Sequence, residues 1–223
     1  MDRTVLSLKE IPMTTLLQVN ASIYNSSGQS SRLADQFVAA FRERDPTAKI
    51  VVRDVAAAEP VPHLNAERFG AFITKPDERS AAQHAMVAYS DTLIDELKQA
   101  DVIVIGLPMY NFGVPSQLKA YFDHIARAGV TFKYTEKGPV GLLTGKKVYV
   151  FAARGGLYAG SPLDTQTSYV RDFLRFLGMT DVEFVYAEGL AISPQSKETA
   201  LAKAVAEIGR LTAYEAPLEK NAA

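Results

Sequence analysis

The chain has 223 residues, 48% of them hydrophobic and 22% charged, which is the balance of an ordinary globular protein. Its 24 Lys and Arg residues against 25 Asp and Glu residues give a net charge of -1, which argues against a nucleic-acid binder and a polybasic membrane anchor. The absence of cysteine excludes a thiol nucleophile, an iron–sulfur cluster and a disulfide, so redox chemistry here requires an organic cofactor.

Targeting and membrane segments are not expected. The longest apolar runs, at 102–109 and 148–153, are far shorter than the ~20 residues of a transmembrane helix. The N-terminal residues lack the apolar core of a signal peptide, so we expect a cytoplasmic protein with no membrane partner. We expect an N-terminal extension over 1–13, a single domain over 14–213 and a C-terminal tail over 214–223.

Predicted strands and helices alternate along the domain. In the first part of the chain, apolar runs and helical spacing predict a strand at 14–20, a polar loop at 21–31, a helix around 33–41 that ends at 45–46, and a strand at 49–55. A connection follows at 56–77, with a short helix near 65–73, and then a helix at 82–97, a strand at 101–110 and a helix at 115–127. The last part is predicted to form a loop at 129–147, a strand at 147–153, a helix at 165–177, a strand at 182–187 and a helix at 193–213.

This alternation predicts an α/β protein with a parallel sheet, helices on both faces and right-handed crossovers. Five strands fit a doubly wound sheet with the flavodoxin-like order 2-1-3-4-5. In such a sheet ligands bind beyond the carboxyl ends of the strands, at the switch point between the first and third strands. We therefore expect the functional site in the loops that follow the first, third and fourth strands.

The loop after the first strand is rich in serine and leads into a helix. A helix amino end offers free N–H groups and the positive end of the helix dipole, and Gly28 lets the backbone approach a ligand closely. This predicts a cradle for a phosphate monoester, although neither a Walker loop nor a GxGxxG motif is present. The alternative is a plain polar loop in which Ser30 or Ser31 caps the helix.

The other two loops offer an apolar platform and a glycine pair. Residues 108–115 combine Met109 and aromatic side chains with proline and glycine, which suits a flat heteroaromatic ligand, although a tight turn that caps the core is the alternative. Residues 153–156 read Ala-Arg-Gly-Gly, and paired glycines allow a ligand to approach the backbone closely. A phosphate cradle, a platform and a glycine wall on one rim indicate a flavin mononucleotide (FMN) site.

Three segments carry a family resemblance: PMYNFGVPSQLKAYFDHIARAGVTFKYT at 108–135, ARGG at 153–156 and SIYNSSGQS at 22–30. With these the chain resembles the FMN-dependent NADH-azoreductases of the flavodoxin-like quinone reductase superfamily, over about 14–212. The resemblance implies reduction of quinones and azo compounds by two-electron hydride transfer through bound FMN, in a ping-pong cycle with NADH or NADPH as donor. It also implies a homodimer with one FMN per subunit near the interface.

The resemblance also implies which residues bind FMN. They are Ser22, Gly28, Gln29 and Ser30 at the phosphate, Pro108, Met109, Tyr110, Asn111 and Phe112 at the isoalloxazine, and Ala153, Arg154, Gly155 and Gly156 at its other edge. The family often has serine where this chain has Gly28 and Ala153, which leaves only backbone donors there. No catalytic acid or base is expected, because the cofactor performs the hydride chemistry.

Some side chains keep two interpretations. Phe112, Tyr134 and Phe176 are predicted to stack on the substrate, the last two from the partner subunit, although Phe176 has the spacing of a core residue. Arg154 either steadies an anionic substrate or forms a local salt bridge. The chain's histidines lack metal-ligand spacing, so no metal site is expected; they are His63, His84 and His124.

Two other functions share the predicted fold. An electron-carrier flavodoxin would bind FMN, but such carriers tend to be strongly acidic, which the net charge of -1 disfavours. A binding or regulatory protein would use the fold without flavin, because a fold alone does not define a function. FMN binding and direct reduction by NADH distinguish the three possibilities.

Overall fold

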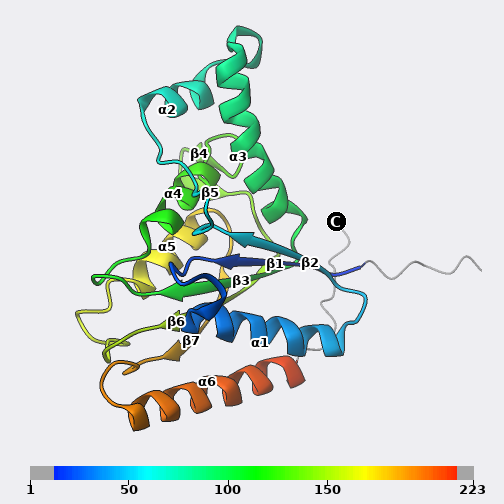
Figure 1. Ribbon diagram of the computed structural model, residues 1–223. Helices are drawn as coiled ribbons and strands as arrows, with labels where there is room; N and C mark the ends of the chain where they lie inside the picture. Colours follow the sequence, from blue (N-terminus) through cyan, green and yellow to red (C-terminus); the bar gives the residue numbers. More distant parts are fainter. Residues whose placement is uncertain (1–12, 215–223) are drawn as a thin grey trace, which may run out of the picture.

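The computed structural model describes residues 13–214 (Figure 1). The expected N-terminal extension and C-terminal tail therefore lie outside the described residues, apart from Met13 and Tyr214. Within the described part of the chain, no helix has the length and apolar character that crossing a membrane requires.

Helices and strands alternate as the sequence predicts. The strands are β1 Thr15–Asn20, β2 Lys49–Asp54, β3 Val102–Pro108, β4 Phe132–Thr135, β5 Gly138–Gly141, β6 Lys147–Ala153 and β7 Asp181–Ala187. The α-helices are α1 Gln29–Arg44, α2 Ala66–Ile73, α3 Ala81–Gln99, α4 Ser116–Ile125, α5 Thr167–Phe176 and α6 Pro194–Tyr214, with short 3-10 turns at η1 Asn25–Ser27 and η2 Pro76–Glu78.

The main sheet is parallel throughout, with the order β2-β1-β3-β6-β7. Because β6 and β7 are its fourth and fifth strands along the chain, the predicted order 2-1-3-4-5 is confirmed. Strand β3 lies at the centre and every one of its residues is buried, as its continuous apolar run predicts. Because β1 and β3 are parallel, their carboxyl ends lie at the same edge of the sheet. The switch point in the strand order falls between these two strands.

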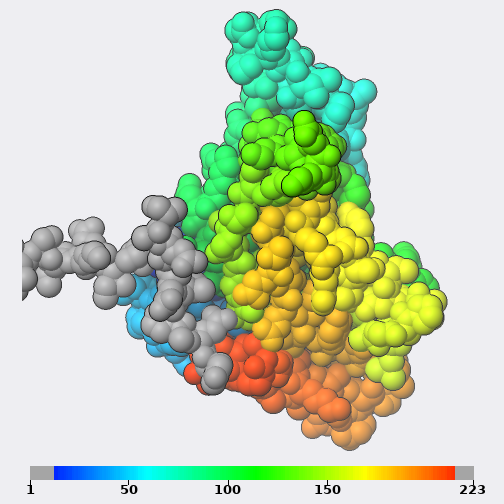
Figure 2. All heavy atoms as spheres, turned by 180° about the vertical axis from the view of Figure 1, so that it is seen from behind, coloured from blue at the N-terminus to red at the C-terminus, as the bar shows by residue number. Residues whose placement is uncertain are grey.

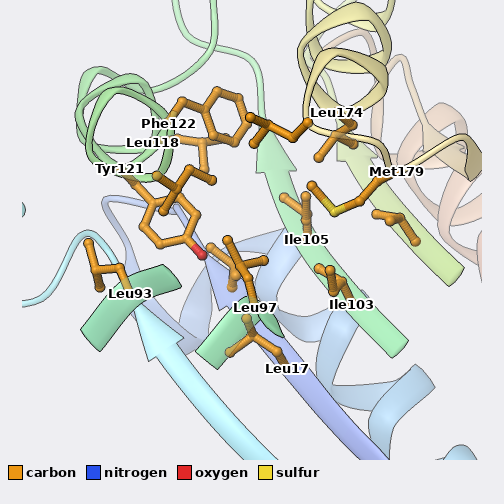
Figure 3. Close-up of a cluster of buried hydrophobic side chains, with 14 of the residues drawn as sticks. Leu17, Leu93, Leu97, Ile103, Ile105, Leu118, Tyr121, Phe122, Leu174 and Met179 are labelled. Atoms are coloured by element: carbon orange, nitrogen blue, oxygen red, sulfur yellow. The ribbon is translucent and has the colours of Figure 1, made fainter. Parts of the chain in front are cut away.

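Helices cover both faces of this sheet (Figure 1). On β3, Ile103 and Ile105 pack toward α3, α4 and α5, while Val102 and Val104 pack toward α1 and α6. Figure 3 shows the first of these cores, where leucine and aromatic side chains of the helices meet the isoleucines of the strand. The labelled helix residues there are Leu93 and Leu97 of α3, Leu118, Tyr121 and Phe122 of α4, and Leu174 of α5.

A β-hairpin corrects the expectation of a loop over 129–147. Strands β4 and β5 pair antiparallel and form a separate two-stranded sheet. Figure 2 shows the green residues of this part of the chain above the yellow residues of α5. The strands are only four residues long and contain glycine and proline, so their sequence carries no strand periodicity. Their stability comes from packing, since the Phe132 ring lies 4.3 Å from the Phe176 ring.

The closest backbone contact of the hairpin gives a stability prediction. A Cβ added at Gly141 would lie 2.0 Å from the backbone N of Gly178, and backbone cannot rotate away. We expect Gly141→Ala to lower the free energy of unfolding by ~1–3 kcal/mol through overpacking. Urea unfolding followed by circular dichroism measures the change.

The matched control is Gly209→Ala in α6, where an added Cβ meets no atom within 4 Å. Alanine favours helix over glycine, so this variant should be as stable as the parent chain or more stable. Equal stability of the Gly141→Ala variant and the parent would show that the hairpin does not pack as described.

Candidate functional site

The three predicted loops meet at the carboxyl edge of the sheet. The Tyr110 hydroxyl lies 3.4 Å from Ser22 Oγ and accepts the backbone N–H of Ile23 at 3.2 Å, which joins the loops after β3 and β1. The backbone N of Met109 donates to the carbonyl of Ala153 at 3.0 Å, which joins the loops after β3 and β6. The fold therefore brings together on one rim the segments that the sequence singled out.

The loop after β1 is compact around Ser22. This serine is buried, and its Oγ accepts the backbone N–H of Tyr24 at 3.2 Å. A Cβ at Gly28 would lie 2.0 Å from Ser22 Oγ, so the close approach of the two segments requires glycine.

The first turn of α1 holds polar groups that have no hydrogen-bond partner within residues 13–214. The cap position is Gly28, which provides no side-chain hydrogen bond to the first turn. Ser30 and Ser31 lie within that turn, so the alternative in which either serine caps the helix is wrong. Their Oγ atoms are buried and have no hydrogen-bond partner within residues 13–214. Unpaired hydroxyls beside free N–H groups at the positive end of a helix suit an anion such as a phosphate.

The loop after β3 is a tight, strained turn. Tyr110 and Gly113 exchange backbone hydrogen bonds of 3.2 and 3.0 Å, and both residues between them have left-handed backbone, with φ of 50° at Asn111 and 63° at Phe112. Left-handed backbone costs ~1–2 kcal/mol per residue outside glycine, and such strain concentrates at functional sites. Both residues are exposed, and their N–H groups find no acceptor within the described chain.

The loop after β6 is anchored by the buried side chain of Arg154. Its guanidinium binds Glu188 at 3.1 Å and Asp164 at 2.9 Å, with neither nitrogen exposed to solvent. It also lies 5.0 Å from the centre of the Tyr186 ring. The local salt bridge is therefore the correct alternative for Arg154, and steadying an anionic substrate is wrong, because the side chain points into the protein.

Glu188 and Tyr158 extend this anchor to the surface. Glu188 accepts the backbone N–H groups of Tyr158 and Ala159, both at 2.9 Å. The Tyr158 ring meets the Phe112 ring edge-on at 5.5 Å and covers Gly156, where a Cβ would lie 2.6 Å from the ring. Tyr158 is a residue of this rim that the sequence interpretation missed, and the signal was an aromatic residue two positions after the glycine pair.

Two predicted substrate residues lie away from the rim of their own chain. Tyr134 and Phe176 flank Phe132 of the hairpin, with ring centres 5.4 and 4.3 Å from it. Phe176 ends α5 and packs against the core, so its core alternative is confirmed for the single chain. Tyr134 is 74% exposed, which leaves it available to another molecule.

An apolar recess of about 410 Å³ lies beside the hairpin, between α4 and the end of the α2 helix. Its lining is mainly aromatic and aliphatic, with a few charged side chains; it includes Phe69, Phe72, Ile73, Arg127, Phe132 and Tyr134. Phe69 and Ile73 are 54% and 70% exposed. Exposed apolar side chains gathered around one recess are typical of an interaction surface.

The chain is similar in sequence and in fold to several known proteins. The model of a family described as having a flavodoxin-like fold matches residues 14–211. An FMN-dependent NADH:quinone oxidoreductase of Cellvibrio japonicus is 55% identical over 191 residues, covering 86% of this chain and 96% of the relative. The structure of an azoreductase from Bacillus anthracis str. Sterne superposes with a TM-score of 0.82 at 30% identity, covering 90% of this chain and 99% of the other. An FMN-dependent NADH-azoreductase from Bacillus anthracis str. Ames Ancestor, solved in complex with FMN, superposes with a TM-score of 0.79 at 28% identity, covering 90% and 100%.

The Arg154 network predicts a pH-dependent stability. Burial acts to raise the pKa of Asp164, but hydrogen bonds from Arg154 and Thr167 outweigh it and hold that pKa below its usual value. We expect Arg154→Met to cost about 3–5 kcal/mol near neutral pH, because two buried carboxylates lose their cation. A carboxyl whose pKa is depressed on folding stabilises the protein above its unfolded pKa, and this contribution disappears as pH falls through the folded pKa.

The gap in stability between the parent and Arg154→Met should therefore shrink at acidic pH, as the pH falls through the depressed pKa of Asp164 and its carboxylate becomes protonated. Urea midpoints measured at neutral and acidic pH test this. Arg175→Met is the control, since Arg175 is exposed and its one ion pair among residues 13–214 is with exposed Asp172, a contact worth ~0–1 kcal/mol. A gap for Arg154→Met that is as small as the control, or constant with pH, contradicts the buried network.

Proposed function

The chain belongs to the flavodoxin-like fold family, and from this membership and the names of its relatives we propose that it is an FMN-dependent NADH:quinone oxidoreductase that also reduces azo compounds. One observation carries the proposal. The buried, unpaired hydroxyls of Ser30 and Ser31 at the uncapped end of α1 lie on the same rim as a strained turn with free N–H groups. Residues 14–213 are thus proposed as one FMN-binding domain.

The phosphate of FMN fits the loop after β1. Ser22, Gly28, Gln29 and Ser30 would hold it, with Ser31 as a further hydroxyl donor in the first turn of α1. The first-turn N–H groups and the helix dipole favour a dianion at this point. Gly28 contributes by its backbone alone, because its position against Ser22 leaves no room for a side chain.

The isoalloxazine fits between the other two loops. Residues Pro108 to Phe112 would form one wall and residues Ala153 to Gly156 the other. Gly155 and Gly156 use their carbonyls within the protein, accepting from Ala191 at 3.0 Å and Gly189 at 2.8 Å. Their N–H groups have no acceptor in residues 13–214, so these donors remain for the ring. Tyr158 and Phe112 would close the edge of the site.

When bound, FMN would supply two-electron hydride chemistry between NADH or NADPH and the quinone or azo compound, in a ping-pong cycle. The chain itself binds and orients the reactants. The backbone N–H groups of Asn111, Gly155 and Gly156 would stabilise the negative charge that develops during reduction, because preorganised donors need no reorganisation as the charge forms. No acid or base side chain from this rim is required.

The functional unit of the proposal is a homodimer in the cytoplasm with one FMN per subunit near the interface. Exposed Tyr134, together with Phe69 and Ile73 around the apolar recess, supports a second copy on this face. Tyr134 and Phe176 would then reach the substrate of the partner subunit, since neither lines the rim of its own chain.

We expect the protein to sediment at twice the 24.3 kDa mass of the chain. Tyr134→Ala should raise the KM for quinone while leaving the Kd for FMN unchanged, because the residue would contact substrate from the partner. Sedimentation velocity and steady-state kinetics measure both quantities. A fully active monomer would contradict the dimer, and an unchanged KM would contradict the role of Tyr134.

FMN titration and NADH oxidation test the proposed activity directly. The purified protein should quench the fluorescence of free FMN, and NADH oxidation by the loaded protein should accelerate when a quinone or an azo dye is added. FMN binding without direct reduction by NADH would instead indicate an electron carrier. Absence of FMN binding would contradict both flavin functions.

A serine variant tests the proposed phosphate cradle. Ser30→Ala should weaken FMN binding about 10-fold, the effect of losing roughly one charge-assisted hydrogen bond, but should leave riboflavin binding unchanged because riboflavin has no phosphate. Ser168→Ala, at an exposed serine of α5, should change neither. Equal weakening of FMN and riboflavin by Ser30→Ala would place the phosphate elsewhere.

A further inference from the structure

We infer that Gln166 is a positioning residue that holds the strained turn at 110–113 in the shape that presents its N–H groups to FMN. This inference rests on the proposed function, although the clamp itself is a property of the protein without cofactor. Gln166 directly precedes α5 and its side chain is fully buried, so it reaches the turn from beneath, inside the protein.

The amide group of Gln166 joins the two ends of the turn. Its Nε2 donates to the carbonyl of Pro108 at 2.8 Å and to the carbonyl of Gly113 at 3.0 Å. Pro108 is the last residue of β3, and Gly113 closes the turn by its backbone bonds with Tyr110. A single planar amide therefore spans the loop from its start to its end, from a residue 58 positions away in the chain.

A second hydrogen bond from the same segment reaches the strained residue itself. The hydroxyl of Thr165 donates to the carbonyl of Phe112. Gln166 and Thr165 are adjacent, so consecutive side chains hold consecutive carbonyls of the turn. The backbone N–H of Gln166 in turn donates to Asp164 at 3.3 Å, which ties the clamp to the Arg154 network.

The turn needs an external clamp because its own sequence does not favour its shape. Two-residue turns with two left-handed residues prefer glycine in the second position, and here that position holds Phe112. Phe112 is 49% exposed and its ring contacts the Tyr158 ring, so little packing holds it in place. Without the clamp, the backbone at 112 would relax toward negative φ and turn the N–H groups of the loop away from the rim.

The hydrogen bonds of Gln166 indicate that its amide nitrogen, rather than its amide oxygen, holds the turn. Its Oε1 is buried and has no partner among the described residues, so only the N–H groups of the amide join it to the turn. A residue that only filled space would be better served by an apolar side chain of the same length. Methionine is such a side chain, and it makes the substitution informative.

The test compares Gln166→Met with the parent protein, first without cofactor. We expect amide hydrogen exchange in residues 109–113 of the apoprotein to become ~10-fold faster, because two hydrogen bonds that restrain the turn are lost. We expect the Kd for FMN to rise ~10-fold, and the visible absorption band of bound FMN to shift at saturation as its N–H donors move.

Thr165→Val supplies a second variant that keeps the shape of an exposed side chain and removes only the bond to Phe112. It should produce the same local increase in exchange, smaller in size, even if Gln166→Met folds poorly. Ser90→Ala is the matched control, since Ser90 is equally buried and its Oγ donates to the carbonyl of His124 at 2.6 Å, within the α3–α4 core. It should lower the unfolding midpoint without changing exchange at 109–113, the Kd for FMN or the absorption band.

Unchanged exchange at 109–113 in both Gln166→Met and Thr165→Val would overturn the inference. Equal changes in Ser90→Ala would do so as well, because they would reflect general loss of stability. If the parent protein does not bind FMN, the proposed function fails on its own, while hydrogen exchange in the apoprotein still decides whether Gln166 holds the turn.

Discussion

The buried ion-pair network of Arg154 is the interaction on which the rest of the rim depends. Its guanidinium contacts Glu188 and Asp164 at once, and each carboxylate then organises a stretch of backbone. Glu188 holds the N–H of Tyr158, and Asp164 holds the N–H groups of Gln166 and Thr167 where α5 begins. A buried charge is tolerated only when such partners surround it, so the loop and its ion pairs stabilise one another.

The Arg154 network also positions the segment that holds the strained turn after β3. The segment that Asp164 fixes carries Thr165 and Gln166, whose side chains hold the carbonyls of the turn after β3. What the rim then offers a ligand is mostly backbone N–H, held from below by buried side chains. Such a rim suits a cofactor that performs the chemistry itself, because the protein then contributes position and donors rather than an acid or base.

Particular elements show why some features were predictable and others were not. Strand β3 was predictable because all of its residues are buried between two helical layers, which leaves an apolar run in the sequence. The hairpin of β4 and β5 was missed because its short strands depend on packing against α5 rather than on their own residues. The serines of the first loop were found by composition, but only the start of α1 at Gln29 showed that Ser30 lies within the helix.

The sequence by itself determined the type and succession of the strands and helices, because apolar runs and helical spacing are local properties of the chain. This succession favoured the strand order that brings three loops to one rim. Only the tertiary structure decided where polar side chains of those loops point. Arg154 and Gln166 find partners 34 and 58 positions away, at Glu188 and Pro108. A buried charge or amide is stable only if a partner in the protein replaces its hydrogen bonds to water. When that partner is distant in the chain, no local sequence pattern reveals whether it is present.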